Sequence, residues 1–313
     1  MRYALKKIAT TLATLLVVSM LLFAAFQLIS GDPATHILGT GATPERLEAL
    51  RAELGLDQPL PARYLMWLSS FVCGDAGVSY VYHQPVSSLL AAKIPVTFVL
   101  ATMSFVLMCA IGLPTGIACA KHAGSPIDRA VMVANQIVMA IPPFFGGILI
   151  SWAFGMGLHL FMPGGYVSYE TSIPHFLGYL VFPSVAIALP RAAQLAKLLR
   201  GSLLEEAGKN YARTAYSRGN DTSGVLYGHL LKNAFLPALT FLGMSLGTML
   251  AGSLVIERVF SIPGISSILL ASIGNRDYPV VLAAVMLIAA FIIFVNLLVD
   301  ILYKVLDPRI DEE

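Results

Sequence analysis

The sequence predicts an all-α integral membrane protein with six transmembrane helices. Three observations lead to this prediction: the composition, a set of long apolar segments, and the placement of the charges. Hydrophobic residues make up 57% of the 313-residue chain and charged residues only 12%, against about 25% charged residues in ordinary soluble domains. The mean hydropathy is +0.77. We therefore expect a multi-pass protein of the cell inner (cytoplasmic) membrane, in contact with membrane lipid and without a nucleic-acid partner.

Six apolar segments are each long enough to cross about 30 Å of hydrocarbon as a helix. The predicted spans are residues 8–29, 96–120, 131–158, 176–199, 234–256 and 279–303. The first is too long for the apolar part of a cleaved signal peptide, which is about 7–15 residues, so we expect it to be retained. Prolines inside the spans, including Pro114, the Pro142–Pro143 pair and Pro190, indicate bent helices packed in a bundle.

Two glycine pairs have the spacing that lets helices approach closely, Gly112 with Gly116 and Gly243 with Gly247. For the first pair, which brackets Pro114, a simple helix kink is the alternative interpretation.

The basic residues are distributed unevenly over the segments that join the spans. If the N-terminus is inside, the inner segments together with the inner half of the fourth span hold 14 of the 20 Lys and Arg residues, and the outer segments hold six. An excess of Lys and Arg marks the cytoplasmic side of membrane proteins. Both termini are therefore predicted to be cytoplasmic, and so is the connection between the fourth and fifth spans.

The chain is predicted to have four parts. They are a cytoplasmic start with the first span (1–30), an extracytoplasmic segment (31–95), a transmembrane core of five spans (96–306) and a C-terminal tail (307–313). Within 31–95, Thr43 as N-cap, Pro44 at the first helical position and Gly55 as the stop predict a short amphipathic helix. This helix either seals the bundle or contacts an external partner.

The cytoplasmic loop, residues 200–233, needs a functional explanation because it is polar between two apolar spans. Helical spacing from Ser202 onward predicts one helix that ends at Gly219, and Asp221 or Thr222 can cap a second helix. The loop has no nucleophile–base pair, no metal-ligand spacing and no phosphate-binding motif. Docking on another protein is the favoured interpretation, and a position on the bilayer surface is the alternative.

Eight residues of this loop resemble a known motif. They are Ala212, Arg213, Thr214, Ala215, Tyr216, Ser217, Arg218 and Gly219. The segment is similar to the coupling-loop motif of ABC-importer permeases, E-A-A-x-x-x-G, in the R-T-A form of the dipeptide/oligopeptide/nickel class. The segments "LGLDQPL" (54–60), "ERVFSIPG" (257–264), "RDYP" (276–279) and "DPRI" (307–310) also resemble this class, so the resemblance covers nearly the whole chain. Asn220 and Arg191 depart from the usual residue types and weaken inference about the substrate.

The resemblance implies the fold of a type I ABC importer permease and a set of partners. These would be a second homologous permease subunit in a heterodimer, two ATP-binding subunits, and an extracytoplasmic solute-binding protein that delivers the cargo. Residues 212–219 would then couple the chain to an ATPase subunit. Because the chain lacks G-x-x-x-x-G-K-[ST], we expect a transport subunit rather than an enzyme. ATP and Mg²⁺ would bind the partner ATPases, with no cofactor in this chain.

Three further residues are candidates for a role in transport. Arg191 is a possible residue of the translocation path, or it reaches to water from the inner mouth of a cavity. Glu257 and Arg258 could form an outer gate, a contact for the binding protein, or an exposed ion pair. No catalytic, cofactor-binding or metal-ligating residue is predicted.

The cargo stays open among several classes. Di- and oligopeptides are the first expectation, and nickel or another metal chelate within the same importer class is the alternative. An ATP-independent secondary transporter is a weaker alternative, based on the broken helices and the few polar residues inside the spans.

Overall fold

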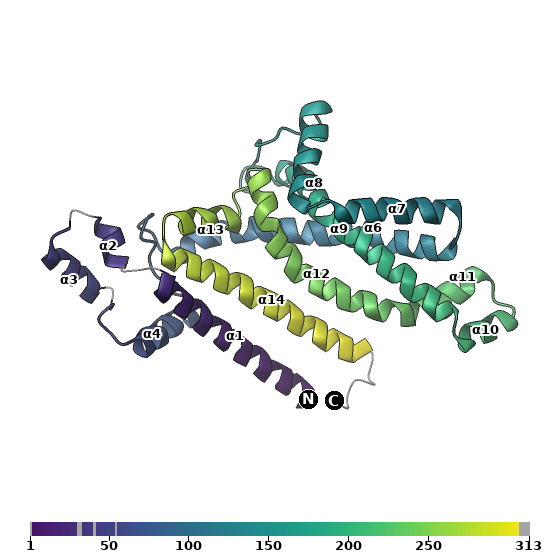
Figure 1. The fold of residues 1–313 in the computed structure, drawn as a ribbon, viewed down its shortest axis with the longest axis horizontal. Coiled ribbons are helices and arrows are strands. Elements are labelled where there is room, and N and C mark those ends of the chain that lie inside the picture. The colour runs from purple at the N-terminus through teal and green to yellow at the C-terminus, as the bar shows by residue number, and fades with distance from the viewer. Residues whose placement is uncertain (1, 30–32, 40–41, 54, 307–313) are drawn as a thin grey trace. The chain divides into compact units, whose positions relative to one another are not determined.

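The computed structural model describes residues 2–29, 33–39, 42–53 and 55–306, which form helices joined by turns (Figure 1). The part of the chain so described contains one isolated antiparallel bridge, Val78 to Pro85, and no longer strand. Two compact units form: residues 1–96 with 263–294, and residues 97–262 with 295–313. The predicted tail, 307–313 with its "DPRI" segment, lies outside the described residues.

The predicted all-α membrane fold is confirmed. Five helices are long and apolar enough to cross a membrane, and a bent helix pair makes a sixth crossing if its two parts are one span. The five are α1 (Arg2–Ile29), α6 (Ile94–Lys121), α9 (Ile173–Ala207), α12 (Leu231–Val259) and α14 (Tyr278–Leu306). Their internal prolines, such as Pro114 and Pro190, do not end the helices.

The third predicted span, 131–158, is not one straight helix. It consists of α7 (Pro126–Ala140), α8 (Pro143–Ile150) and the π-helical turn η1 (Ser151–Gly157), with a bend of 103° between α7 and the α8–η1 part. Ile141 adopts an extended conformation with ψ 120°. A residue before proline disfavours the helical region, so the Pro142–Pro143 pair produces a sharp break here. The prediction of a bent helix is confirmed, and the bend is much larger than an ordinary proline kink.

The first unit holds most of the predicted extracytoplasmic segment. Its short helices are α2 (Pro33–Leu38), α3 (Pro44–Glu53), α4 (Leu60–Val72), α5 (Val86–Ala91) and α13 (Ile265–Gly274). The predicted helix after Thr43 is α3, and Gly55 follows it with φ +65°. Helix α4 packs on α1, where the hydroxyls of Ser19 and Tyr64 lie 2.7 Å apart and the Phe23 ring contacts Tyr64 edge-on.

The second unit is built around α9, which contacts α12, α7 and α8. Gly112 and Gly116 of α6 lie against the α9 backbone: a Cβ atom on either would be 2.9 Å from the carbonyl oxygen of Ala192 or Ala196, respectively. Close helix approach is therefore the role of this glycine pair, and the kink alternative is not needed.

The α6–α7 turn is fixed to α9 by an ion pair. The guanidinium of Arg200 donates two hydrogen bonds of 2.7 Å to the carboxylate of Asp128, which is 2% exposed. The backbone N–H of Gly124 donates a third, of 2.8 Å. Ser125 accepts from the Asp128 N–H and so caps α7. The turn between two spans is thereby held to the end of α9.

Candidate functional site

The predicted helix from Ser202 to Gly219 is two helices, so that prediction is wrong in its middle. Helix α9 ends at Ala207 with Gly208 as its cap, and Lys209 is extended, with ψ 155°. A new helix, α10 (Asn210–Ser217), follows at once. Glycine is a poor interior helix residue, which accounts for the break at Gly208. The helical spacing of the apolar residues nevertheless continues across this break in the backbone.

The turn after α10 forms as the sequence predicts. Gly219 has φ +86°, the left-handed conformation that glycine adopts without steric cost. The Asn220 side-chain amide donates to the Ala215 carbonyl oxygen at 3.0 Å and supports the turn. Asp221, rather than Thr222, caps the next helix by accepting from the Gly224 N–H at 2.9 Å.

Beyond this cap the chain rejoins the membrane helices. The short α11 (Thr222–Val225) continues into the π-helical turn η2 (Leu226–Leu230) and then into α12. Leu226 and Leu230 are both buried, as expected for residues four apart on one helix face. The sequence from α9 to α12 is thus helix, break, helix, glycine turn, helix.

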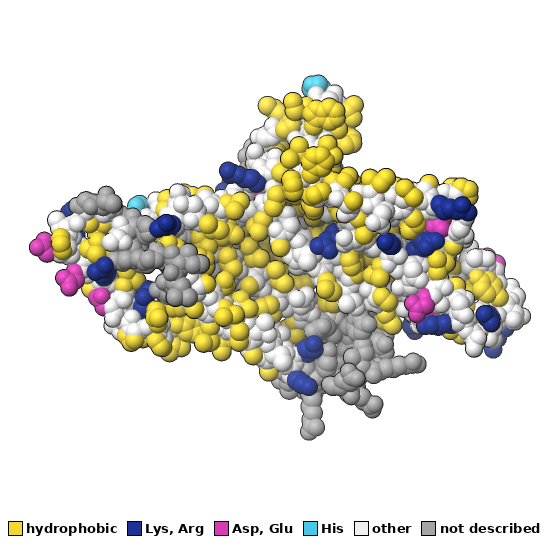
Figure 2. Space-filling model, in the orientation of Figure 1, with side chains coloured by type: hydrophobic (Ala, Val, Ile, Leu, Met, Phe, Trp, Pro, Cys, Tyr) yellow, Lys and Arg dark blue, Asp and Glu magenta, His cyan; other side chains and the backbone are white. Residues whose placement is uncertain are grey.

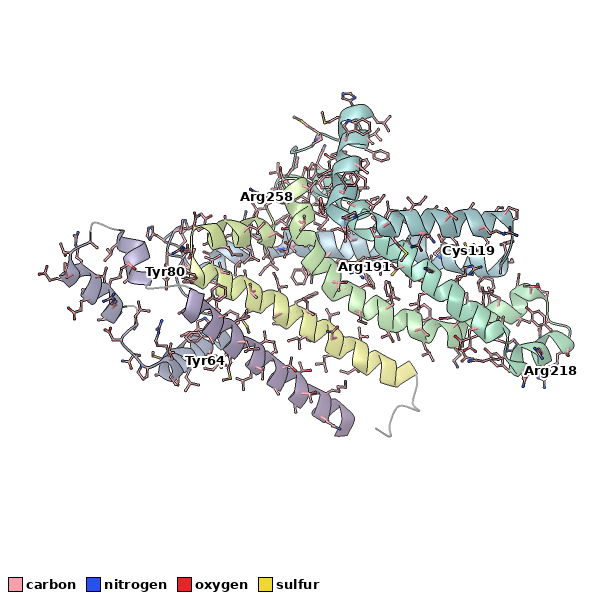
Figure 3. The ribbon with its side chains drawn as sticks, viewed as in Figure 1. Tyr64, Tyr80, Cys119, Arg191, Arg218 and Arg258 are labelled. Atoms are coloured by element: carbon pink, nitrogen blue, oxygen red, sulfur yellow. The ribbon has the colours of Figure 1, made fainter. Side chains whose placement is uncertain are left out.

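Helix α10 has a small buried face and a polar exposed one. Ala212 is fully buried and Ala215 nearly so, which lets α10 lie close to α9, α11 and η2. The exposed residues are Arg213, Thr214, Tyr216, Ser217, Arg218 and Gly219; we call them the α10 surface. Figure 3 places Arg218 at the end of α10. This surface combines two guanidinium groups with an aromatic ring, residue types that are enriched at protein interfaces.

A hydrogen-bond network holds α10 at the break. Glu206 of α9 accepts from the Lys209 ammonium at 2.6 Å and from the Tyr211 hydroxyl. Tyr211 also accepts from the Asn233 side chain of α12 at 3.2 Å. The hydrogen bond to Glu206 raises the pKa of Lys209, and burial, followed by the bond to Glu206, raises the pKa of Tyr211. The start of α10 is therefore linked to both α9 and α12.

Arg191 lies within α9, directly after Pro190, and is half-buried (Figure 3). Its guanidinium donates to the side-chain oxygen of Gln194 at 3.3 Å. The two residues are three positions apart, so they occupy the same face of the helix. The role of Arg191 in a translocation path stays a prediction.

Glu257 and Arg258 differ in their surroundings, although they are neighbours in sequence. Glu257 is fully buried near the end of α12 and accepts from the Thr97 hydroxyl of α6 at 2.6 Å. Arg258 is exposed (Figure 3). An exposed ion pair of these two residues therefore does not describe the site, since Glu257 is inside the protein. Because Glu257 is buried, only the exposed Arg258 of this pair could make a surface contact. Both that contact and a gate role for Glu257 stay predictions.

Several pairings that organise the site have no signal in the sequence. The hydrogen bonds that Tyr211 donates to Glu206, Arg200 to Asp128 and Thr97 to Glu257 join residues whose partners depend on packing. Over the described residues, no group of three or more His, Cys, Asp or Glu side chains could hold a metal ion.

Two family descriptions match the chain. Residues 112–312 match the binding-protein-dependent transport system inner membrane component, and residues 1–101 match the N-terminal region of such membrane components. A protein of Sinorhizobium fredii named "Probable peptide ABC transporter permease protein" is 33% identical over 98% of both chains. The oligopeptide transport system permease protein AppB of Bacillus subtilis is 32% identical over 99% of both chains.

Proposed function

Because the chain belongs to the family of binding-protein-dependent transport system inner membrane components, and is thus a multi-pass permease subunit of an ABC transporter, we propose that it imports peptides across the cytoplasmic membrane with energy from ATP. The cargo class rests on the names of the relatives, which include peptide and oligopeptide permeases over nearly their whole length. Nickel or a metal chelate is a second cargo class with no specific observation in its favour.

The α10 surface is the observation that carries the ATP-driven part of the proposal. It presents Arg213, Tyr216 and Arg218 on a short helix at the break between two membrane helices. In the proposed complex this surface lies on the cytoplasmic side, in contact with one of two ATP-binding subunits. A second homologous permease completes the membrane part, and an extracytoplasmic binding protein delivers the peptide.

The hydrogen-bond network at the base of α10 supports a mechanical role for this helix. When the ATPase subunits close on ATP, they would displace α10. Since Glu206 and Asn233 link Tyr211 to α9 and α12, the displacement would move both helices rather than bend a free loop. ATP binding then shifts the permease between inward-facing and outward-facing states, because it favours one of them.

The test is a charge reversal on the α10 surface in the complete complex. We would express this chain with its partner subunits, purify through a tag on this chain, and measure ATP hydrolysis and peptide uptake in proteoliposomes with the loaded binding protein. The variant Arg213→Glu/Arg218→Glu should lose the ATPases or their stimulation. Lys121→Glu, an exposed cation at the end of α6, should keep both. If the chain purifies without ATPases and still moves solute without ATP, the proposal is wrong.

A further inference from the structure

Helix α4 has three faces of different character, and the first of them packs on α1. Successive residues of a helix are rotated by about 100°, so Tyr64, Trp67 and Phe71 project to the same side of α4. The ring centroids of Tyr64 and Trp67 lie 5.6 and 5.8 Å from that of Phe23 in α1 (Figure 3), and Phe71 stacks on Trp67. This aromatic face is therefore the side of α4 that contacts the first membrane helix.

The second face of α4 is apolar and accessible. It consists of Pro61, Leu65, Leu68 and Val72, which we call the α4 ridge; at this spacing they form one line along the helix, about 90° from the aromatic face. Leu65 is 62% exposed and Val72 77%. Figure 2 shows hydrophobic side chains gathered over α4 and the adjoining part of α1. An accessible apolar surface of this kind marks contact with a membrane or with another protein.

The third face of α4 is polar and lies opposite the ridge. It carries Arg63 and Ser70, about 180° from the ridge around the helix. Burial and the charge of Asp277 raise the pKa of Tyr80, and the positive charge of Arg63 partly offsets that rise. Arg63 is thus near the loop at residues 79–81, so the polar face is turned toward the predicted outer loop and the ridge away from it.

The contact with α1 sets the depth of α4 in the membrane. The apolar stretch of α1, residues 8–29, is 22 residues long, about 33 Å as a helix, which matches the hydrocarbon layer of about 30 Å. Ser19, whose hydroxyl meets that of Tyr64, and Phe23 precede Ile29 by ten and six residues, about 15 and 9 Å along the axis. A helix that contacts α1 at this level lies inside the leaflet. With 13 residues, about 20 Å, α4 is too short to cross the bilayer.

We propose that α4 lies flat in one leaflet of the membrane, with the α4 ridge among the lipid acyl chains and Arg63 at the level of the headgroups. In the predicted orientation this is the outer leaflet, so residues 60–72 of the predicted extracytoplasmic segment are embedded in the membrane. Tyr and Trp are enriched at the edge of the hydrocarbon layer, and helices with an apolar and a polar face bind there.

Lipid fits the α4 ridge better than a protein partner does. A membrane protein beside α1 would approach α4 from the side, whereas the ridge, opposite the polar face, points toward the centre of the bilayer. The neighbouring surface also faces lipid, since only 6% of the apolar window of α1 is buried. The ridge therefore continues the lipid-facing surface of the first span.

The first experiment measures the accessibility of spin labels in the complex of this chain with its partner subunits, in vesicles of phosphatidylethanolamine and phosphatidylglycerol. In a chain with Cys73, Cys109 and Cys119 replaced by serine, the label is attached at Leu65→Cys or, as matched control, at Ser70→Cys. Oxygen concentrates in hydrocarbon, and a water-soluble chromium chelate is excluded from it. The ratio of oxygen to chelate collisions should be several-fold higher for Leu65→Cys.

Two results would overturn the proposal. Collisions mainly with the chelate at both positions would place α4 in water. A Leu65→Cys label that is shielded from oxygen and chelate alike would mean that protein covers the ridge, as a contact with the second permease would. The measurement is independent of transport, so it does not depend on which cargo the complex carries.

A second experiment disrupts the ridge and follows the release of α4. In lipid nanodiscs, which leave both sides of the bilayer accessible, trypsin should cut the native complex slowly after Arg63. Leu65→Asp should raise that cleavage rate several-fold, because a carboxylate is unfavourable among acyl chains. Ser70→Asp adds the same charge to the polar face and should be cut as slowly as the native chain, with the site identified by mass spectrometry. Equal cleavage of the two variants would show that the ridge does not hold α4 in the membrane.

Discussion

The carboxylate of Asp277 accepts a hydrogen bond from the hydroxyl of Ser79, a residue 198 positions earlier in the chain. Both side chains are buried. The same carboxylate accepts from the N–H groups of Tyr80 at 3.0 Å and Val81 at 3.4 Å. Burial and, to a lesser extent, the charge of Asp277 raise the pKa of Tyr80. The Asp277 carboxylate, directly before the last membrane helix, thus holds the loop at residues 79–81 of the predicted outer segment in place.

Replacing this carboxylate should destabilise the loop. Asp277→Ala leaves the Ser79 hydroxyl and two backbone N–H groups without their acceptor, at a cost of about 2–4 kcal/mol. We expect a lower thermal unfolding temperature in detergent and faster proteolysis within residues 75–85. Asp57→Asn, at an exposed carboxyl, is the control and should match the native protein. Equal protection of the loop in both variants would contradict the role assigned to Asp277.

Gly219 should be intolerant of β-branched residues for a backbone reason. Its φ is +86°, and a Cβ atom at this position would have no other atom within 4 Å, so the cost is conformational rather than steric, about 1–2 kcal/mol. Gly219→Val should reduce peptide uptake while membrane insertion stays normal. Gly228→Val is the control, since Gly228 has equal space and no positive φ. Undiminished uptake by a well-assembled Gly219→Val complex would refute the prediction.

The ion pair between Asp128 and Arg200 should contribute more to the free energy of unfolding than the exposed side chain of Arg129, which is next to Asp128 in the sequence. Arg200→Ala removes two hydrogen bonds from a carboxylate that is almost inaccessible in the folded chain, which leaves that charge without its partner. Arg129 is exposed and donates to the Gly124 carbonyl oxygen. Thermal unfolding should show a larger loss for Arg200→Ala than for Arg129→Ala. A double-mutant cycle with Asp128→Ala should give a coupling free energy well above zero.

Replacing Gly112 by a larger residue should disrupt the close packing of α6 on α9. A Cβ atom there would lie 2.9 Å from the Ala192 carbonyl oxygen, and overpacking of this kind costs about 1–3 kcal/mol. Gly112→Val should therefore lower the unfolding temperature. Gly178→Val in α9, where nothing lies within 4 Å of a Cβ, tests the effect of valine alone. Similar losses for the two variants would mean that the close approach contributes nothing.

Local signals predicted the elements that depend on neighbouring residues in the sequence. The helix after Thr43, the glycine turn at Gly219 and the cap at Asp221 all formed as expected. Each follows from backbone geometry and from hydrogen bonds within about four residues. The break at Lys209 was missed because the helical spacing of apolar residues continues through it, and spacing reports the buried face rather than the continuity of the backbone.

The sequence by itself determined the membrane fold and the number of apolar segments, because transfer of an apolar stretch of about 20 residues from water to lipid depends on composition. The family followed separately, from the resemblance of short motifs such as residues 212–219. Only the tertiary structure decided the 103° bend between α7 and α8, the burial of Glu257 against Thr97, and the packing of α4 on α1. These features depend on which surfaces neighbouring helices cover. The hydropathy pattern does not predict which helix surfaces are covered, since a side chain can be buried by residues far away in the sequence.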